Sequence, residues 1–403
     1  MFNFILIIMI MIFNVSVYAE QTVVPTDQNI TIKRDFDLSQ DTPDLSIWMQ
    51  KINGLSPIDL ENWTNTYGGE VYFCLSDENP EYGACKSRAS RPGVAGTTII
   101  RLQLTERRSG MRTIVELEGM SGMYFSDEDI QTKCTMTKPA TNYNPSVFNL
   151  SSLPQINPKC QYLGRDGGWW TASGEGTYLT VKLSTGQQFP VGGVWEGTLI
   201  LKQGSYYKSQ GRVSDATWTA HLQFDVTDAN HIDIYFPEFG TAAPLVPLNI
   251  HPTGGASPTP GGQDVTNLDM CLYDGFNVNS SKYEVLLEDG NHHTPAGRPM
   301  GWFSVYRDGG DENQPRDRID YQVRMNNPET DAMMDVRNGE LITWNAVNTH
   351  RVRPVRLPSI SYPVLCAPTP LEFRVNKFAT ADKNAGQYHG TLRVTFTPTT
   401  TTL

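Results

Sequence analysis

The chain has 403 residues, a formal net charge of −11 and a charged fraction of 19%. This length is enough for two or three domains with real cores, and the acidic balance argues against nucleic acid or an anionic membrane as the main partner. Many Gly, Pro, Thr and Tyr residues, with little helical periodicity, predict an all-β protein.

Residues 1–19 are typical of a secretory signal peptide. The apolar run from Met1 to Phe13 is too short to span a bilayer comfortably, and small residues precede a cleavage position after Ala19. No lysine or arginine precedes the run, and a transmembrane anchor is the alternative. We therefore expect an exported protein.

The cysteine count predicts three disulfides, because an even number in an exported chain usually pairs. No C-x-x-C pair occurs, which argues against zinc or redox chemistry. Cys74 and Cys85 flank a hairpin-like turn and could bridge across it, and a bond between Cys134 and Cys160 would close a long loop. We expect the pairs Cys74–Cys85, Cys134–Cys160 and Cys271–Cys366, with the pairing of the first four left open.

The first half of the chain is expected to contain one lead-in segment and several short strands. Residues 20–44 are polar and predict an extended arm, and 45–52 could form a short helix. Residues 97–105 and 112–118 alternate well and predict a hairpin. Residues 121–168 are irregular. Further strands are expected at 70–75, 176–183, 194–201, 216–226 and 231–236.

A domain boundary is indicated by composition near the Gly/Pro-rich stretch 252–262, with 237–247 as a competing position. Beyond it, strands are expected at 268–273, 283–287, 302–306, 319–325, 362–366 and 371–375.

The final stretch, 384–398, predicts one more strand with one buried and one exposed face. Its apolar face carries Tyr388, Leu392, Val394 and Phe396. From the pattern alone, an earlier strand of the same domain is the simpler cover for its free edge. A strand supplied by another protein is the alternative.

Catalytic and metal-binding patterns are weak. Ser205-x-x-Lys208 lacks any supporting motif, His292-His293 is best interpreted as a solvated loop tip, and 308–313 departs from the spacing of a calcium loop. We expect no catalytic residue, no metal site and no cofactor.

Three stretches carry a resemblance to one family: 188–195 (QFPVGGVW), 252–255 (PTGG) followed by 268–281 (LDMCLYDGFNVNSS), and 363–368 (PVLCAP) with 385–390 (AGQYHG). All six cysteines also fall at the expected places. The sequence resembles the minor tip adhesins of CFA/I-type (class 5) fimbriae and the related CblD-like fimbrial tip proteins, over nearly the whole mature chain.

The resemblance implies two tandem immunoglobulin-like β-sandwich domains. The expected organisation is an N-terminal adhesin domain at 20–240, a short linker at 241–243 and a C-terminal pilin domain at 244–403, in which 245–250 forms the first strand. The C-terminal domain is implied to be an incomplete pilin fold completed by a donated strand, with Tyr388, Leu392, Val394 and Phe396 lining its groove.

The implied partners are a periplasmic chaperone, an outer-membrane usher, the major fimbrial subunit as strand donor, and a host surface glycan or glycoprotein. The implied path runs through the periplasm to the fimbrial tip at the cell surface. Two alternatives are a structural fimbrial initiator subunit without receptor binding, and a free secreted glycan-binding or glycan-cleaving β-sandwich protein.

The family carries an exposed arginine cluster linked to receptor binding, and this sequence departs from it. The segment 202–212 has no adjacent arginine pair, and a further basic position of the family aligns with Gly69. Aromatic rings and cations can bind sugars, so the receptor-binding candidates are Lys202, Tyr206, Tyr207, Lys208 and Arg212. An ordinary polar loop is the alternative. Arg107-Arg108 is expected to be a solvated charge pair, and Trp169-Trp170 is expected in the core.

Overall fold

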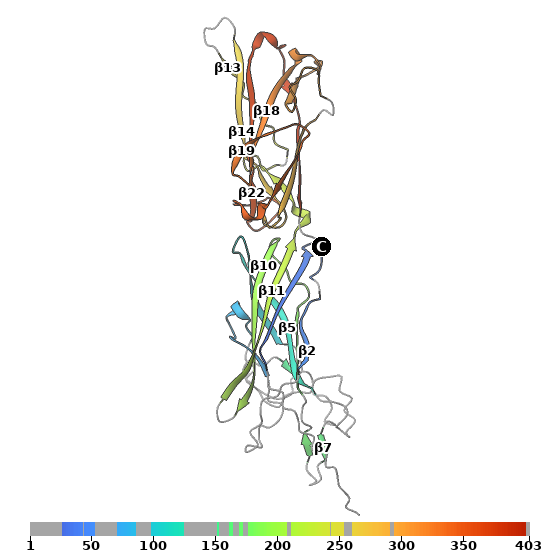
Figure 1. Cartoon of the computed structure of the whole chain (residues 1–403), viewed down its shortest axis with the longest axis vertical. Coiled ribbons are helices and arrows are strands. Elements are labelled where there is room, and N and C mark those ends of the chain that lie inside the picture. Colours follow the sequence, from blue (N-terminus) through green and yellow to red (C-terminus); the bar gives the residue numbers. More distant parts are fainter. Residues whose placement is uncertain are drawn as a thin grey trace, which may run out of the picture.

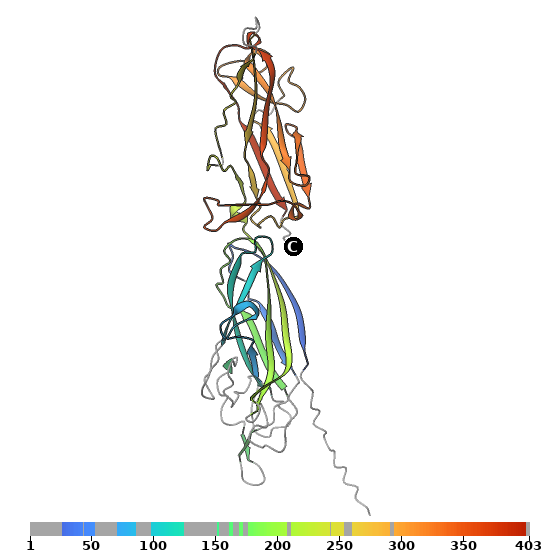
Figure 2. The same cartoon turned by 90° about the vertical axis from the view of Figure 1, so that its left-hand side faces the viewer.

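The chain folds into two elongated β-structures stacked end to end (Figures 1 and 2). This computed structural model describes residues 26–42, 44–52, 71–85, 98–124, 151–152, 161–163, 169–171, 176–207, 211–241, 243–253, 260–290 and 294–399. We call the described residues up to 231 the first domain and those from 233 onward the second domain. Within these ranges the structure is all-β with a few 3₁₀ turns, which confirms the predicted class and the two-domain architecture.

The described part of the first domain is built on one large sheet. Its neighbouring strands are, in order, β1 (Gln28–Asp37), β11 (Gly211–Thr227), β10 (Gly193–Tyr207), β4 (Thr98–Glu106), β5 (Arg112–Tyr124), β9 (Gly176–Leu183) and β2 (Ser46–Ile52). Two shorter strands extend this sheet: β3 (Val71–Cys74) pairs with β10, and β6 (Ser151–Ser152) pairs with β5. A separate two-stranded sheet consists of β7 (Gln161–Leu163) and β8 (Trp169–Thr171). The 3₁₀ turns are η1 (Pro80–Tyr82) and η3 (Ala229–His231).

Aromatic side chains contribute to the core of the first domain. Trp218 is fully buried and makes edge-to-face contacts with Trp48 and Tyr72, at centroid distances of 5.5 and 5.0 Å. Its indole nitrogen donates a hydrogen bond to Gln203 Oε1, which satisfies the one polar group that burial would otherwise leave unpaired.

The second domain contains three sheets in its described residues. One is β12 (Asp233–Tyr235), β15 (Cys271–Tyr273), β22 (Val364–Pro368), β21 (Arg353–Val355); another is β20 (Leu341–Asn345), β16 (Lys282–Asp289), β25 (Leu392–Thr399). The largest is β13 (His251–Thr253), β14 (Gly261–Leu268), β23 (Leu371–Ala379), β18 (Arg318–Asn327), β17 (Phe303–Arg307), β24 (Tyr388–His389), with β19 (Ala332–Val336) beside β18. Its 3₁₀ turns are η4 (Pro315–Asp317), η5 (Val347–Thr349) and η6 (Thr380–Asp382).

Two sequence predictions about the N-terminal part are wrong. The polar lead-in contains the strand β1, which pairs in parallel with β11 and half-buries Ile30, Ile32 and Phe36. The expected helix at 45–52 is the strand β2. A register shift between Ser46 and Trp48 places neighbouring apolar residues inward, which imitates a helical pattern.

Two disulfides tie strands together within the described residues. Cys74 is bonded to Cys85, and Cys271 is bonded to Cys366. The second bond joins β15 to β22 across 95 residues of sequence. The expected pair Cys134–Cys160 lies outside the described residues.

At the junction, the backbones of the two domains are in direct contact. A Cβ atom at Gly192 would lie 2.0 Å from Gly275 O and 3.1 Å from Val226 O, and Asp228 N donates to the same Gly275 oxygen at 2.8 Å. β12, inside the range predicted for the first domain, pairs with β15 of the second. The boundary at 241–243 stays a prediction, and Ala242 lies outside the described residues.

Gly192→Ala is expected to lower the free energy of unfolding by about 2 kcal/mol or more, because neither backbone carbonyl can move aside cheaply. Thermal unfolding of the full chain measures this loss. Gly290→Ala is the matched control, since its nearest neighbour, Thr391 Cβ, would lie at an ordinary 3.4 Å. Equal melting temperatures for the two variants would contradict the close packing of the junction.

Candidate functional site

The last strand of the chain, β25, is an edge strand. It pairs with β16 alone in the described structure, with Leu392 opposite Asp289 and Phe396 opposite Val285. Its side chains alternate between half-buried and exposed along its whole length. The half-buried row includes Leu392, Val394 and Phe396, which pack on the second-domain core. This row therefore borders the core without being covered by it.

The hydrogen-bond pattern between β25 and β16 also shows which backbone groups of β25 have no partner in that sheet. Just before β25, Gly290 N donates to Thr391 O at 2.8 Å. Because hydrogen-bonding direction alternates along an antiparallel strand, the N–H groups of Leu392, Val394 and Phe396 point away from β16. The apolar row and these amides thus share one open edge.

A second half-buried row lies on the segment 244–250. Val246, Leu248 and Ile250 are half-buried and pack on the same core, while Leu245, 84% exposed, points outward. The segment carries no strand pairing, so the prediction of a first strand at 245–250 is wrong. Pro244 and Pro247 lack backbone N–H groups, which explains the missing ladder.

Tyr388 occupies a different place from the other three predicted groove residues. It lies in β24, where it pairs with Arg307 of β17, and its hydroxyl donates to Asn384 O at 2.6 Å and Arg316 O at 3.0 Å. The predicted continuous strand is therefore two strands in two sheets. The break falls at Gly390, where a Cβ would lie 2.9 Å from Ser304 O.

Behind the open edge lies an aromatic pair, one ring of which is fully buried. Phe396 stacks edge-to-face on Tyr283 with the ring centroids 4.9 Å apart. Tyr283 is fully buried, and this burial raises the pKa of its hydroxyl well above the ordinary value. The site offers apolar surface and backbone hydrogen bonds, which are the requirements of an added strand.

The receptor-binding candidates lie on the long β10–β11 hairpin. The hairpin begins at Gly193, directly after Gly192 of the junction. Its far end lies on the side of the first domain away from the second domain (Figure 1). Fourteen steps of about 3.3 Å place that end roughly 46 Å from the junction. There Tyr206 is opposite Arg212 and Tyr207 is opposite Gly211.

The structure places these candidates unequally. Lys202 is half-buried, and its ammonium donates to Thr217 Oγ1 at 2.5 Å. Lys208 lies outside the described residues. Tyr206, Tyr207 and Arg212 are described in backbone only, so the register brings Tyr206 and Arg212 together without showing side-chain contacts.

The paired arginines of the β4–β5 turn differ from each other, and the prediction of a solvated pair is wrong for Arg108. Arg107 is half-exposed and donates to Glu196 Oε1 at 2.6 Å. Arg108 reaches into the second domain and donates to main-chain oxygens there. No short-range pattern predicts this, because the acceptors lie about 170 to 242 residues away in sequence.

The other sequence candidates show structural roles or fall outside the description. Asp317 accepts from Arg307 Nε and Asn384 Nδ2, which lowers the pKa of that carboxyl, and it also fixes the 308–313 turn through Asp311 N. His292-His293 lies outside the described residues. Within the described residues, no group of three His, Cys, Asp or Glu side chains is placed to hold a metal, and no helix could span a membrane.

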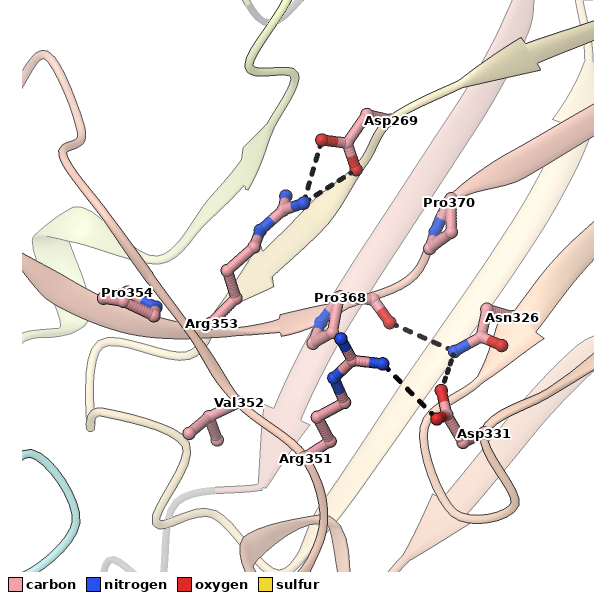
Figure 3. A pocket seen from close by; sticks show the side chains of 9 residues that line it. All are labelled: Asp269, Asn326, Asp331, Arg351, Val352, Arg353, Pro354, Pro368 and Pro370. Atoms are coloured by element: carbon pink, nitrogen blue, oxygen red, sulfur yellow. Dashed lines mark hydrogen bonds and ion pairs between the residues drawn. The ribbon is translucent and has the colours of Figure 1, made fainter.

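A polar cleft of about 310 Å³ lies on the second domain (Figure 3). Arg353 donates to both oxygens of Asp269 at 2.9 and 3.1 Å, and Arg351 lies 3.5 Å from Asp331. Both arginines of this cleft are therefore paired with aspartates of the same domain.

The comparisons with known proteins agree across both domains. Residues 17–229 match the family of the first domain of CfaE, the E subunit of CFA/I fimbriae, and residues 232–400 match the family of its second domain. The CFA/I fimbrial E subunit of Escherichia coli is 30% identical over 365 residues, which cover 87% of this chain and 88% of that protein.

Two solved structures share the fold over almost the whole chain. CfaE, described as the adhesive subunit of CFA/I fimbria of enterotoxigenic Escherichia coli, gives a TM-score of 0.72 at 24% identity, covering 95% of both chains. A structure described as a chaperone–tip adhesin complex of CFA/I fimbriae biogenesis gives 0.59 at 23% identity, covering 94% of this chain and 98% of that one.

Two all-β domains in tandem, each matched by one of the two domain families of the same fimbrial subunit, identify a two-domain fimbrial subunit. The chain belongs to the CfaE family, the tip adhesins of CFA/I-type fimbriae.

Proposed function

We propose that the second domain is an incomplete pilin fold that accepts a strand from another protein. The observation that supports this is the open edge of β25, where Leu392, Val394 and Phe396 are half-buried and their amides point away from β16. The guest strand would lie between this row and the row formed by Val246, Leu248 and Ile250, since both rows pack on one core.

The length of the open edge determines how long a bound strand can be. The eight residues of β25 span about 26 Å, so the site takes an extended segment of about eight residues. Apolar side chains at alternate positions would fill the space between the two rows, and main-chain hydrogen bonds would provide affinity. Binding of a peptide from the N-terminus of the major fimbrial subunit to the full chain tests this directly.

An apolar edge of this length would aggregate if it were left open during export. A periplasmic chaperone covering it first, followed by replacement with the N-terminal strand of the major subunit at an outer-membrane usher, fits this requirement. The signal-peptide-like residues 1–19 fit export to the periplasm and then to the fimbrial tip. The chain needs no catalytic residue for this role.

The first domain is proposed to bind a host surface glycan or glycoprotein through the far end of the β10–β11 hairpin. That end lies on the side of the first domain away from the second domain (Figure 1), so a receptor can reach it without contacting the fimbrial shaft. Aromatic and cationic residues at 206, 207 and 212 match the apolar faces and polar groups of sugars.

The variant Tyr206→Ala/Arg212→Ala is expected to reduce binding to host cells, and to any glycan bound on an array, at least about tenfold, since such contacts dominate small interfaces. Arg107→Ala is the control, because it removes a cation from the opposite end of the same domain. Wild-type binding by the double variant would place the receptor site elsewhere. No host-cell binding by the wild type would favour a structural initiator subunit.

A further inference from the structure

The β4–β5 turn of the first domain contacts the second domain through the side chain of Arg108. The guanidinium of Arg108 donates to Val278 O at 3.1 Å, to His350 O at 2.7 Å and to Asn348 O. Burial lowers the pKa of this guanidinium, so the carbonyl oxygens replace water that the side chain has lost. One cation thus links three backbone groups of the other domain.

A buried carboxylate holds the turn in shape. Glu106 is fully buried and accepts from Ser109 N and Ser109 Oγ at 2.6 Å and from Arg108 N at 3.1 Å. It also accepts from Asn279 Nδ2 at 3.0 Å, which belongs to the second domain. The turn conformation that presents Arg108 is therefore stabilised by hydrogen bonds to Glu106 from both domains.

The backbone that Arg108 binds is itself in an unusual conformation. Asn277 and Val278 both have left-handed φ angles, 52° and 57°, and for a β-branched residue such as Val278 this is a strained state. Inside the loop, the Asp274 carboxylate accepts from Phe276 N, Val278 N and Ser280 N. Arg108 adds a hydrogen bond from the first domain to the carbonyl oxygen of Val278.

The oxygens bound by Arg108 flank the sheet that carries the open edge. Val278 precedes β16, and Asn348 and His350 follow β20. β16 lies between β20 and β25, with Lys282 opposite both Asn345 and Thr399. Arg108 therefore holds the junction end of the three-stranded sheet to which β25 belongs.

We propose that Arg108 is a positioning residue that couples the groove of the second domain to the junction with the first, so that a strand filling the groove also fixes the first domain in place. This rests on the proposed function of the groove. A guest strand would order β25 against β16, which would hold the loop at Val278 in the conformation that Arg108 binds. By linkage, the junction and the groove then stabilise each other.

The experiment uses the full chain with and without a guest strand fused after Leu403. The extension is Thr-Asn-Gly followed by thirteen residues in which Val and Thr alternate, with Val first and last. A two-residue Asn-Gly turn returns the chain antiparallel, and thirteen residues are needed to run back from the turn along β25 to Leu392. Filling of the groove is read from slowed hydrogen exchange of the Val394 amide. Opening of the junction is read from chymotrypsin cleavage after Phe239, a 38% exposed residue in the segment that follows β12.

In the wild type, the fused strand is expected to slow cleavage after Phe239 at least about fivefold, the lower end of usual coupling between sites. In Arg108→Met, which keeps the apolar stem, this ratio is expected to fall to about one while the Val394 amide remains protected. Arg107→Ala, one residue away, is expected to retain the wild-type ratio. Asn279→Ala, a milder change, is expected to lower the ratio in the same direction.

The two hypotheses fail differently. If the fused strand leaves the Val394 amide unprotected in the wild type, the groove function itself is wrong. If the strand protects Val394 but slows cleavage equally in the wild type, Arg108→Met and Asn279→Ala, the coupling is overturned and the groove function stands.

Discussion

Val394→Asp is expected to abolish the stable complex with a periplasmic chaperone that the proposed function requires, and with it incorporation into fimbriae. Val394 is half-buried in the middle of the apolar row of β25. A strand laid over the groove would bury the new carboxylate without a partner, at a cost of at least about 3 kcal/mol, or about a hundredfold in the binding constant. Co-purification of the two proteins from the periplasm measures the complex.

Thr395→Asp is the matched control for this charge. Thr395 is the next residue of the same strand, and its side chain is exposed, so a carboxylate there stays in water whether or not the groove is filled. Near-normal recovery of the complex is expected. If Val394→Asp also binds the chaperone normally, the open edge of β25 is not the surface that the chaperone covers.

Removal of the Cys271–Cys366 disulfide is expected to destabilise the protein more than removal of Cys74–Cys85. The two bonds span 95 and 11 residues of sequence, and in the chain-entropy model their loss costs about 4.7 and about 2.8 kcal/mol. The longer bond also ties β15 to β22 beside the junction. Denaturant unfolding of Cys271→Ala/Cys366→Ala and Cys74→Ala/Cys85→Ala measures both losses.

The order of the two losses is the informative result. A larger loss for the Cys74→Ala/Cys85→Ala variant would show that native packing around that bond, rather than loop closure, dominates. If Cys271→Ala/Cys366→Ala folds with unchanged stability, the bond is not part of the framework that holds the second domain.

The final strand shows which structural features the alternation of apolar and polar residues can predict. Alternation alone places Leu392, Val394 and Phe396 on one face, and the structure shows these three as a half-buried row. The separation of Tyr388 into another sheet was not predictable from the pattern. It depends on the close approach of Gly390 to the Ser304 carbonyl, a contact set by the tertiary structure.

The strand β1 was missed because its apolar pattern is diluted by polar residues. β1 is an edge strand whose Ile30 and Ile32 are only half-buried between polar residues, so its apolar signal is weak. The junction was missed for a different reason. Arg108 is an ordinary turn residue in sequence, and only the folded chain brings Val278 and His350 to its guanidinium.

The receptor site is the part that sequence defines least. The resemblance indicates a region and not residues, because the arginine cluster of the family is absent at 202–212. The structure adds the register of Tyr206 with Arg212 and the hydrogen bond that Lys202 donates to Thr217. Lys202 is consequently the weakest candidate of those within the described residues.

Residue-resolved hydrogen exchange on β25 tests the central claim most directly. The amides of Leu392, Val394 and Phe396 are expected to exchange rapidly in the free chain. A peptide from the N-terminus of the major fimbrial subunit is expected to slow them at least about a hundredfold, while the amide of Thr395, which faces β16, changes much less. Strong protection of all four amides in the free chain would show an edge already covered by the protein's own backbone and would contradict the account.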